Sequence, residues 1–225
     1  MIGEYGGPRL HVIGEPVWPG RSPEEIREVT KHEALINLAW PDTSIRALCP
    51  YDAAALRPEV LDGAERTHPC VIRHGKGASS QLYSEGAMPS GCEQPLQLPP
   101  DRARSLRFGI DDLFKLRSMV GEVAHDAGLG DDRTADLMLV TSELGTNAIR
   151  HGDGTGVLHA WRADREVVCQ VEDHGQIADP LVGRRRPVTG GTGGLGLWMV
   201  NQLCDLVEVR SGKRGTTVRA HLSLS

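Results

Sequence analysis

The chain has 225 residues, which suits one large domain or two small ones. Its hydrophobic and charged fractions, 39% and 24%, are ordinary for a globular protein. The net charge of −5 gives no general attraction to nucleic acid or to anionic membranes, so we expect neither direct nucleic-acid binding nor membrane association.

Five cysteines are spread along the chain without a C-x-x-C pair: Cys49, Cys70, Cys92, Cys169 and Cys204. Their odd number and spacing argue against a disulfide framework or a zinc site and are typical of a reducing cytosol. The N-terminus lacks the basic and apolar segments of a signal peptide. No stretch approaches the roughly 20 apolar residues that span a bilayer. We therefore expect a cytoplasmic protein.

The N-terminal part, residues 1–75, predicts a strand, a helix, a strand and a helix. Residues 22–25 (SPEE) form a capping box with proline at the first helical position, and this helix should run to about Trp40. Residues 44–50 predict a short buried strand that ends at Pro50, and residues 57–69 predict a second helix. This order indicates a small α/β domain fragment.

Residues 76–104 are rich in Gly, Ser and Pro and have no sustained periodicity, which predicts a linker. The remaining residues, 105–225, carry stronger patterns. They predict helices over 110–127 and from Asp131 or Asp132 to about Arg150, strands over 156–161 and 166–173, a long loop over 174–193, a helix over 195–204, and a hairpin over 206–222. Strands joined by tight turns, with helices on one side, predict an α+β fold with a two-layer α/β sandwich.

Three polar residues are spaced by four along the second of these helices: Glu143, Asn147 and His151. Positions i, i+4 and i+8 of a helix lie nearly in line, so these side chains share one edge beside the apolar stripe. Two interpretations explain this pattern: a solvent-exposed polar edge of the helix, or a row of side chains that act together in a functional site.

Asp173, followed by His174 and Gly175, lies where the second predicted strand ends. The motif is compatible with a simple turn. It also suits a carboxylate that accepts hydrogen bonds from a ligand amine, with a glycine that allows the ligand to approach the backbone.

Glycines crowd residues 190–196 (GGTGGLG), immediately before a helix. Free backbone N–H groups at a helix N-terminus bind phosphate, whereas a flexible hinge is the other interpretation. Gly194 and Gly196 near the helix start each cost about 1 kcal/mol relative to Ala. That cost favours the phosphate site.

Taken together and in this order, the three motifs resemble the superfamily of gyrase, heat-shock chaperone, histidine kinase and MutL ATPases. The family's Glu-x-x-x-Asn-Ala-x-x-His box is matched by Glu143, Asn147, Ala148 and His151. Its two glycine boxes are matched by Asp173 with Gly175 and by residues 194–197 (GLGL), and a Gly-Thr pair by residues 215–216. Within this superfamily, residues 105–222 are most similar to the bacterial anti-sigma-factor serine kinases.

The resemblance implies ATP and Mg²⁺ as cofactors and a role for each matching residue. Glu143 is the general base, and Asn147 is the Mg²⁺ ligand. Asp173 binds the adenine amino group. The other nucleotide-binding residues are His151, Gly175, Gly194, Leu195, Gly196 and Thr216. One arginine of residues 184–186, represented here by Arg185, contacts the phosphates from the lid, whereas a solvated loop is the other interpretation of this basic run. Ile177 and Thr192 depart from the family's glycine pattern, and both lie in the expected lid.

The implied function is an anti-sigma-factor serine/threonine kinase that phosphorylates a protein antagonist and sequesters a sigma factor. Two alternatives stay open: a non-enzymatic, nucleotide-dependent protein-binding module, and an ATPase switch without a protein substrate. The sequence is compatible with a homodimer but does not fix the oligomeric state.

Residues of about 8–75 resemble the back half of a small-ligand sensory domain found in actinobacterial anti-sigma regulators, so an intact ligand pocket is not expected. Glu33 falls near the apolar stripe of its helix, which favours a buried, partnered carboxylate over a sensor or interface residue. Cys49 and Cys70 are interpreted as small core residues.

Overall fold

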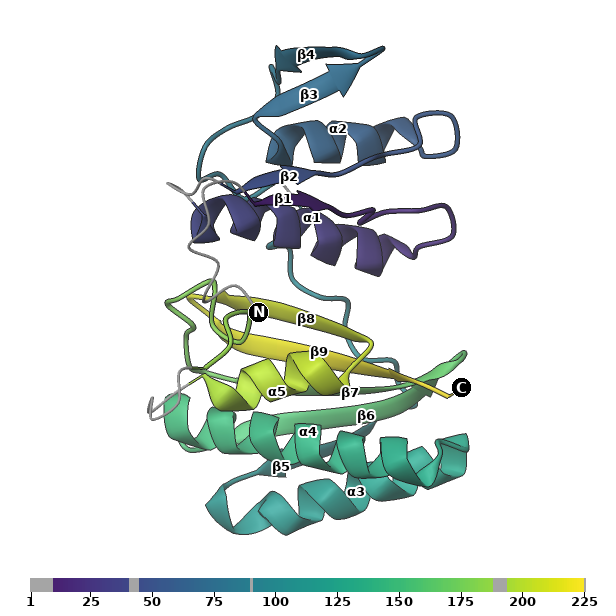
Figure 1. The fold of residues 1–225 in the computed structure, drawn as a ribbon. Helices are drawn as coiled ribbons and strands as arrows, with labels where there is room; N and C mark the ends of the chain where they lie inside the picture. Colours follow the sequence, from purple (N-terminus) through teal and green to yellow (C-terminus); the bar gives the residue numbers. More distant parts are fainter. Residues whose placement is uncertain (1–9, 41–44, 90, 188–193, 225) are drawn as a thin grey trace. The chain divides into compact units, whose positions relative to one another are not determined.

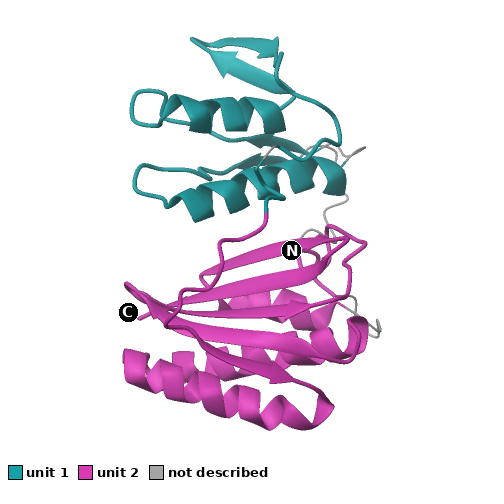
Figure 2. Ribbon diagram, turned by 180° about the vertical axis from the view of Figure 1, so that it is seen from behind, with its two compact units in different colours: residues 1–94 teal, residues 95–225 magenta. Residues whose placement is uncertain are grey.

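The computed structural model describes residues 10–40, 45–89, 91–187 and 194–224. The chain divides into two compact units, residues 1–94 and 95–225, which Figure 2 shows in different colours. Each unit is described by itself. The range predicted as a linker, 76–104, contains a strand that belongs to unit 1 at its start and the beginning of a strand of unit 2 at its end.

Unit 1 contains two parallel strands, β1 (His11–Ile13) and β2 (Arg46–Leu48), with the helix α1 (Pro23–Ala39) between them in the chain. A second helix, α2 (Pro58–Thr67), packs against α1 (Figure 1). The predicted strand, helix, strand and helix are thus confirmed. The expectation of a buried second strand is wrong, because all three residues of β2 are exposed.

The start of α1 shows why this helix was predictable. The Ser22 hydroxyl accepts a hydrogen bond from the Glu25 backbone N–H at 3.1 Å, and the Glu25 carboxylate accepts one from the Ser22 backbone N–H at 2.7 Å. Both bonds satisfy N–H groups that have no partner within the helix. The capping box is therefore confirmed.

Unit 1 also contains an antiparallel hairpin that the sequence did not predict, β3 (Cys70–Arg73) and β4 (Lys76–Ser79). Its two-residue turn has His74 at φ 49° and Gly75 at φ 75°, both in the left-handed region. Such turns match the twist of a hairpin. The interpretation of Cys70 as a core residue is wrong, because it lies exposed on β3, while Cys49 is half-buried.

Unit 2 is an α+β two-layer sandwich, as predicted. Its antiparallel five-stranded sheet has the order β5-β6-β7-β9-β8, and the helices cover one face of it (Figure 1). The strands are β5 (Arg104–Phe108), β6 (Gly156–Ala163), β7 (Glu166–Asp173), β8 (Leu206–Gly212) and β9 (Gly215–Ser223). The helices are α3 (Leu113–Ala127), preceded by a 3₁₀ turn η1 (Ile110–Asp112), α4 (Asp131–His151) and α5 (Leu195–Leu203).

The core of unit 2 lies between the helices and the sheet. From α4 it contains Leu137, Val140, Leu144 and Ala148, all almost completely inaccessible to solvent. The last strand contributes Val218, Ala220 and Leu222 to the same core. Glu143, Asn147 and His151 form a polar line on α4 beside this apolar stripe. Because the stripe packs into the core, it fixes the orientation of the helix and therefore of this polar line.

Within the described part of the chain, the helices are all too short or too polar to cross a bilayer.

Candidate nucleotide site

The first turn of α5 lies directly against the polar line of α4. A Cβ placed on Gly196 would be 2.6 Å from the Glu143 carboxylate Oε2 and 3.4 Å from the Asn147 side-chain nitrogen. Only a residue without a side chain allows this approach. Glu143 and Asn147 therefore lie beside the N-terminal end of α5, and both residues are half-buried.

The start of α5 depends on Gly194, which is its N-cap. Its φ of 86° lies in the left-handed region, so a glycine is required there for conformational reasons. Exposed Leu195 is the first residue of the helix. The backbone N–H groups of this first turn have no acceptor within the helix, an arrangement that suits the binding of an anion.

A second group of predicted residues meets where β7 ends. The Asp173 carboxylate accepts a hydrogen bond from the Gly175 backbone N–H at 2.6 Å. The Thr216 hydroxyl donates to the Gly175 carbonyl oxygen at 2.9 Å, and Thr216 pairs with Asp173 in the register of β7 and β9. These contacts hold the Asp173 side chain and the following turn in one arrangement.

Two glycines allow this close packing. A Cβ on Gly175 would lie 2.3 Å from the carbonyl oxygen of His151, the last residue of α4. A Cβ on Gly215 would lie 2.1 Å from the carbonyl oxygen of Asp173, and its φ of 121° is in the left-handed region. The end of α4 therefore touches the Asp173 turn through its backbone, while the side chain of His151 is exposed.

Burial raises the pKa of the Asp173 carboxyl, although the hydrogen bond from Gly175 opposes this effect. The Asp153 carboxylate nearby raises it further. Asp153 itself accepts a hydrogen bond from the ring of His174 at 2.9 Å when that nitrogen carries the proton. A half-buried carboxylate at the end of a strand is well placed to accept a hydrogen bond from a ligand amine.

The structure thus brings most of the predicted residues to one end of unit 2. Glu143, Asn147 and Gly196 form one group, Asp173, Gly175 and Thr216 form another, and α4 connects them. Arg185 is exposed in the loop between β7 and α5, and within the described residues its side chain makes no hydrogen bond or ion pair. Gly190 to Gly193 lie outside the described residues.

One residue of this region was missed by sequence reasoning. The Ser211 hydroxyl lies 2.8 Å from the Thr216 hydroxyl and accepts a hydrogen bond from the Ile177 backbone N–H at 2.8 Å. It therefore ties the beginning of the loop to the β8–β9 hairpin. A serine in a predicted turn gives no signal for such a role, which only the pairing of β8 with β9 produces.

Solved structures of known proteins are similar to about half of this chain. The chain is similar to the RsbU and RsbW domains of a Mycobacterium tuberculosis protein, with 24% identity and a TM-score of 0.40, over 54% of this chain and 32% of that one. It is also similar to a blue-light activated histidine kinase from Erythrobacter litoralis, with 23% identity and a TM-score of 0.37, over 50% of this chain and 41% of that one. The catalytic domain of the histidine kinase ThkA matches with 15% identity and a TM-score of 0.36, over 54% of this chain and 96% of that one.

The chain spans about a third to two fifths of the length of the first two of these structures. No curated protein matches it. Residues 2–69 match the family described as the methanogen/methylotroph, DcmR sensory domain, in agreement with the expected sensory part. Residues 109–222, just over half of the chain, match the histidine kinase-like ATPase domain, so the chain belongs to the histidine kinase-like ATPase family.

Proposed function

We propose that this chain is an anti-sigma-factor serine/threonine kinase that phosphorylates a protein antagonist and sequesters a sigma factor. The observation that carries the proposal is the position of the Glu143 carboxylate and the Asn147 amide against the first turn of α5. A general base and a Mg²⁺ ligand are then adjacent to backbone N–H groups that hold phosphate.

The residues fit ATP and Mg²⁺, because Gly196 leaves free the space that a Cβ beside Glu143 and Asn147 would fill. Asn147 offers its amide oxygen to Mg²⁺, which when bound neutralises charge on the phosphates. Asp173 accepts hydrogen bonds from the adenine amino group, and Thr216 supports it through Gly175. Arg185 suits a phosphate contact, since its guanidinium matches phosphate geometry.

Glu143 acts on the protein substrate. It takes the proton of a serine or threonine hydroxyl of the antagonist, whose oxygen bonds to the γ-phosphorus of ATP as the bond to ADP breaks. His151, exposed at the end of α4, lies at the outer margin of the site. We further propose a cytoplasmic location, supported by five cysteines that form no disulfide with one another. No contact with nucleic acid or membrane is part of this proposal.

Replacement of the proposed general base, Glu143, distinguishes a role in phosphoryl transfer from a role in ATP binding. In Glu143→Ala we expect transfer of label from radiolabelled ATP to the antagonist to fall by about 10²–10⁴-fold, because the hydroxyl loses its proton acceptor. ATP binding measured by calorimetry should persist. Glu122→Ala removes an exposed glutamate of α3 and is the matched control, with unchanged transfer expected. Full transfer in Glu143→Ala would disprove the role of the base.

Two further variants test the placement of the nucleotide. Asn147→Ala and Asp173→Ala should each lose Mg²⁺–ATP affinity, and full affinity in either would place the site elsewhere. Acid-stable label on the antagonist identifies Ser or Thr as the acceptor. Phosphate release without labelled protein would instead indicate an ATPase switch. Binding of a partner protein that depends on nucleotide, without ATP hydrolysis or phosphoryl transfer, would indicate a non-enzymatic module.

A further inference from the structure

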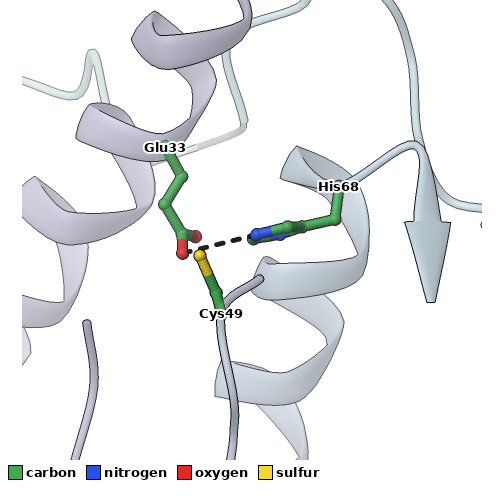
Figure 3. Close-up of side chains that lie close together, drawn as sticks. All are labelled: Glu33, Cys49 and His68. Atoms are coloured by element: carbon green, nitrogen blue, oxygen red, sulfur yellow. Dashed lines mark ion pairs between the residues drawn. The ribbon is translucent and has the colours of Figure 1, made fainter. Parts of the chain in front are cut away.

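Three side chains of types that bind metals meet inside unit 1, which contains none of the predicted nucleotide residues. A carboxylate oxygen of Glu33, the Sγ of Cys49 and a ring nitrogen of His68 all lie within 4.8 Å of one another. Figure 3 shows them converging from α1, from the segment after β2 and from the end of α2. The fold of unit 1 alone brings these distant positions together.

The Glu33 carboxylate is buried, with 5% of the residue exposed. The Tyr51 hydroxyl donates to its Oε1 at 2.5 Å, and the Thr67 hydroxyl donates to its Oε2 at 3.0 Å. These neutral donors hold the carboxylate in place but leave its charge unneutralised. A buried charge is costly unless an opposite charge compensates it, so this position calls for a cation.

The His68 ring is oriented by a backbone group. Its Nδ1 lies 2.7 Å from the carbonyl oxygen of Ala64, and since a carbonyl only accepts, Nδ1 carries the proton of this bond. The other nitrogen, Nε2, faces Glu33 Oε1 at 3.7 Å. In a neutral ring two lone pairs would face each other, an arrangement that a second ring proton or a metal ion between them would relieve. A ring N–H donated to a carbonyl is the usual support of a metal-binding histidine.

Cys49 favours the metal over the second proton. An imidazolium–carboxylate pair is complete without a sulfur atom, whereas a sulfur, nitrogen and oxygen set is typical of Zn²⁺ and unsuited to Mg²⁺ or Ca²⁺. Zn²⁺ bond lengths in a tetrahedron place one sulfur, one nitrogen and one oxygen ligand roughly 3.3–3.7 Å apart, with the nitrogen–oxygen pair at the short end. The distance of 3.7 Å between His68 Nε2 and Glu33 Oε1 is a little longer than such a pair requires, and all three donor atoms lie within 4.8 Å of one another, so a small inward movement of the side chains closes the site around an ion.

We propose that unit 1 binds one Zn²⁺ ion through Glu33, Cys49 and His68, with a fourth position open to water or to a small exogenous ligand. Three protein ligands and one open position distinguish exchangeable zinc sites from closed structural ones. The sequence argued against a zinc site because it lacks a C-x-x-C pair. This site takes one donor from each of three segments, a pattern without any sequence signature.

Metal titration of the tag-free, full-length chain under reducing conditions tests the proposal. After removal of bound metal, one Co²⁺ per chain should produce a thiolate-to-cobalt charge-transfer absorption, and Zn²⁺ should displace it. Cys49→Ser should abolish this absorption and weaken Zn²⁺ binding by at least about 100-fold, since a direct ligand matters at least as much as an outer partner. Cys70→Ser removes an exposed cysteine of the same unit and should change neither.

Thermal unfolding provides an independent readout. Saturating Zn²⁺ should raise the melting temperature of the wild type and of Cys70→Ser, because a ligand that binds only the folded state stabilises it. Glu33→Gln and His68→Gln should each lose most of this rise, which covers the case in which Cys49→Ser fails to fold. An ion pair without a metal predicts no dependence on Zn²⁺ in the wild type. That result, or unchanged Zn²⁺ affinity in Cys49→Ser, would overturn the proposal.

Discussion

Gly196, in the first turn of α5, lies against Glu143 and Asn147 of α4 in the candidate nucleotide site. In Gly196→Ala the new Cβ would lie 2.6 Å from Glu143 Oε2, so the carboxylate has to move. We expect phosphoryl transfer to fall by roughly 10–100-fold, as small misplacements of reacting groups do. The free energy of unfolding should stay the same or rise by up to about 1 kcal/mol, because Ala favours a helix. Transfer assays and denaturant titrations of the same variant measure both.

Gly130→Ala is the matched control for this prediction. Gly130 precedes another helix, α4, and no atom lies within 4 Å of the position of its Cβ. Phosphoryl transfer should therefore stay at the wild-type rate. Equal losses in both variants would contradict the role assigned to the contact of Gly196 with Glu143.

The sequence predicts individual site residues only where they follow a regular pattern, such as helical spacing or a run of glycines. Glu143 and Asn147 follow helical spacing, and Gly196 lies in a glycine run before a helix. Their assignment to a nucleotide site remains a prediction. Ser211 and the group around Glu33 could not be foreseen, because their partners lie on other elements and no periodicity links them.

At the scale of the element, the capping box makes α1 the best specified helix of unit 1. Ser22→Ala removes the hydroxyl that accepts from the Glu25 backbone N–H. We expect a loss of about 1 kcal/mol in the free energy of unfolding of unit 1, as for other N-cap replacements. Circular dichroism during denaturant titration measures it. Ser84→Ala, at an exposed serine without a side-chain hydrogen bond in the described residues, should cost nothing measurable.

Elements with strong periodicity or caps were predictable, whereas the short strands β3, β4 and β5 were not. The capped and striped helices α1, α3 and α4 begin within a few residues of their predicted starts. β5 has only Leu106 and Phe108 as alternating apolar residues, too few for a reliable pattern. β4 reads KGAS and is fully exposed, so only its pairing with β3 makes it a strand.

At the scale of the whole molecule, the polar groups of the sheet make stability depend on pH. His221 on β9 lies 2.9 Å from a Glu166 carboxylate oxygen and 3.3 Å from one of Glu208. Burial alone would lower the pKa of His221, but these two hydrogen bonds outweigh it and raise the pKa to about 9. The imidazolium therefore connects β9 to its neighbours β7 and β8 at neutral pH.

The pKa of His221 in the folded state lies above its unfolded value of 6.5, so protonation of His221 stabilises the folded state. The stabilisation is fully present below about pH 6.5 and is lost as the pH rises through about 9. We expect the free energy of unfolding of unit 2 to fall by a few kcal/mol across this interval. Denaturant titrations from pH 6 to about pH 10 check it, and His221→Gln should flatten the curve. A wild-type curve as flat as that of the variant would refute the assignment.

The strand order has a consequence for the synthesis of the protein. β9 leaves the ribosome after the other four strands of its sheet, yet it lies inside that sheet, between β7 and β8. Until it arrives, β8 has no partner in the sheet and Asp173 lacks the neighbour that Thr216 provides. The nascent chain therefore cannot complete the proposed nucleotide pocket while translation of this strand is unfinished, and under that proposal nucleotide stabilises the unit only after translation has passed it.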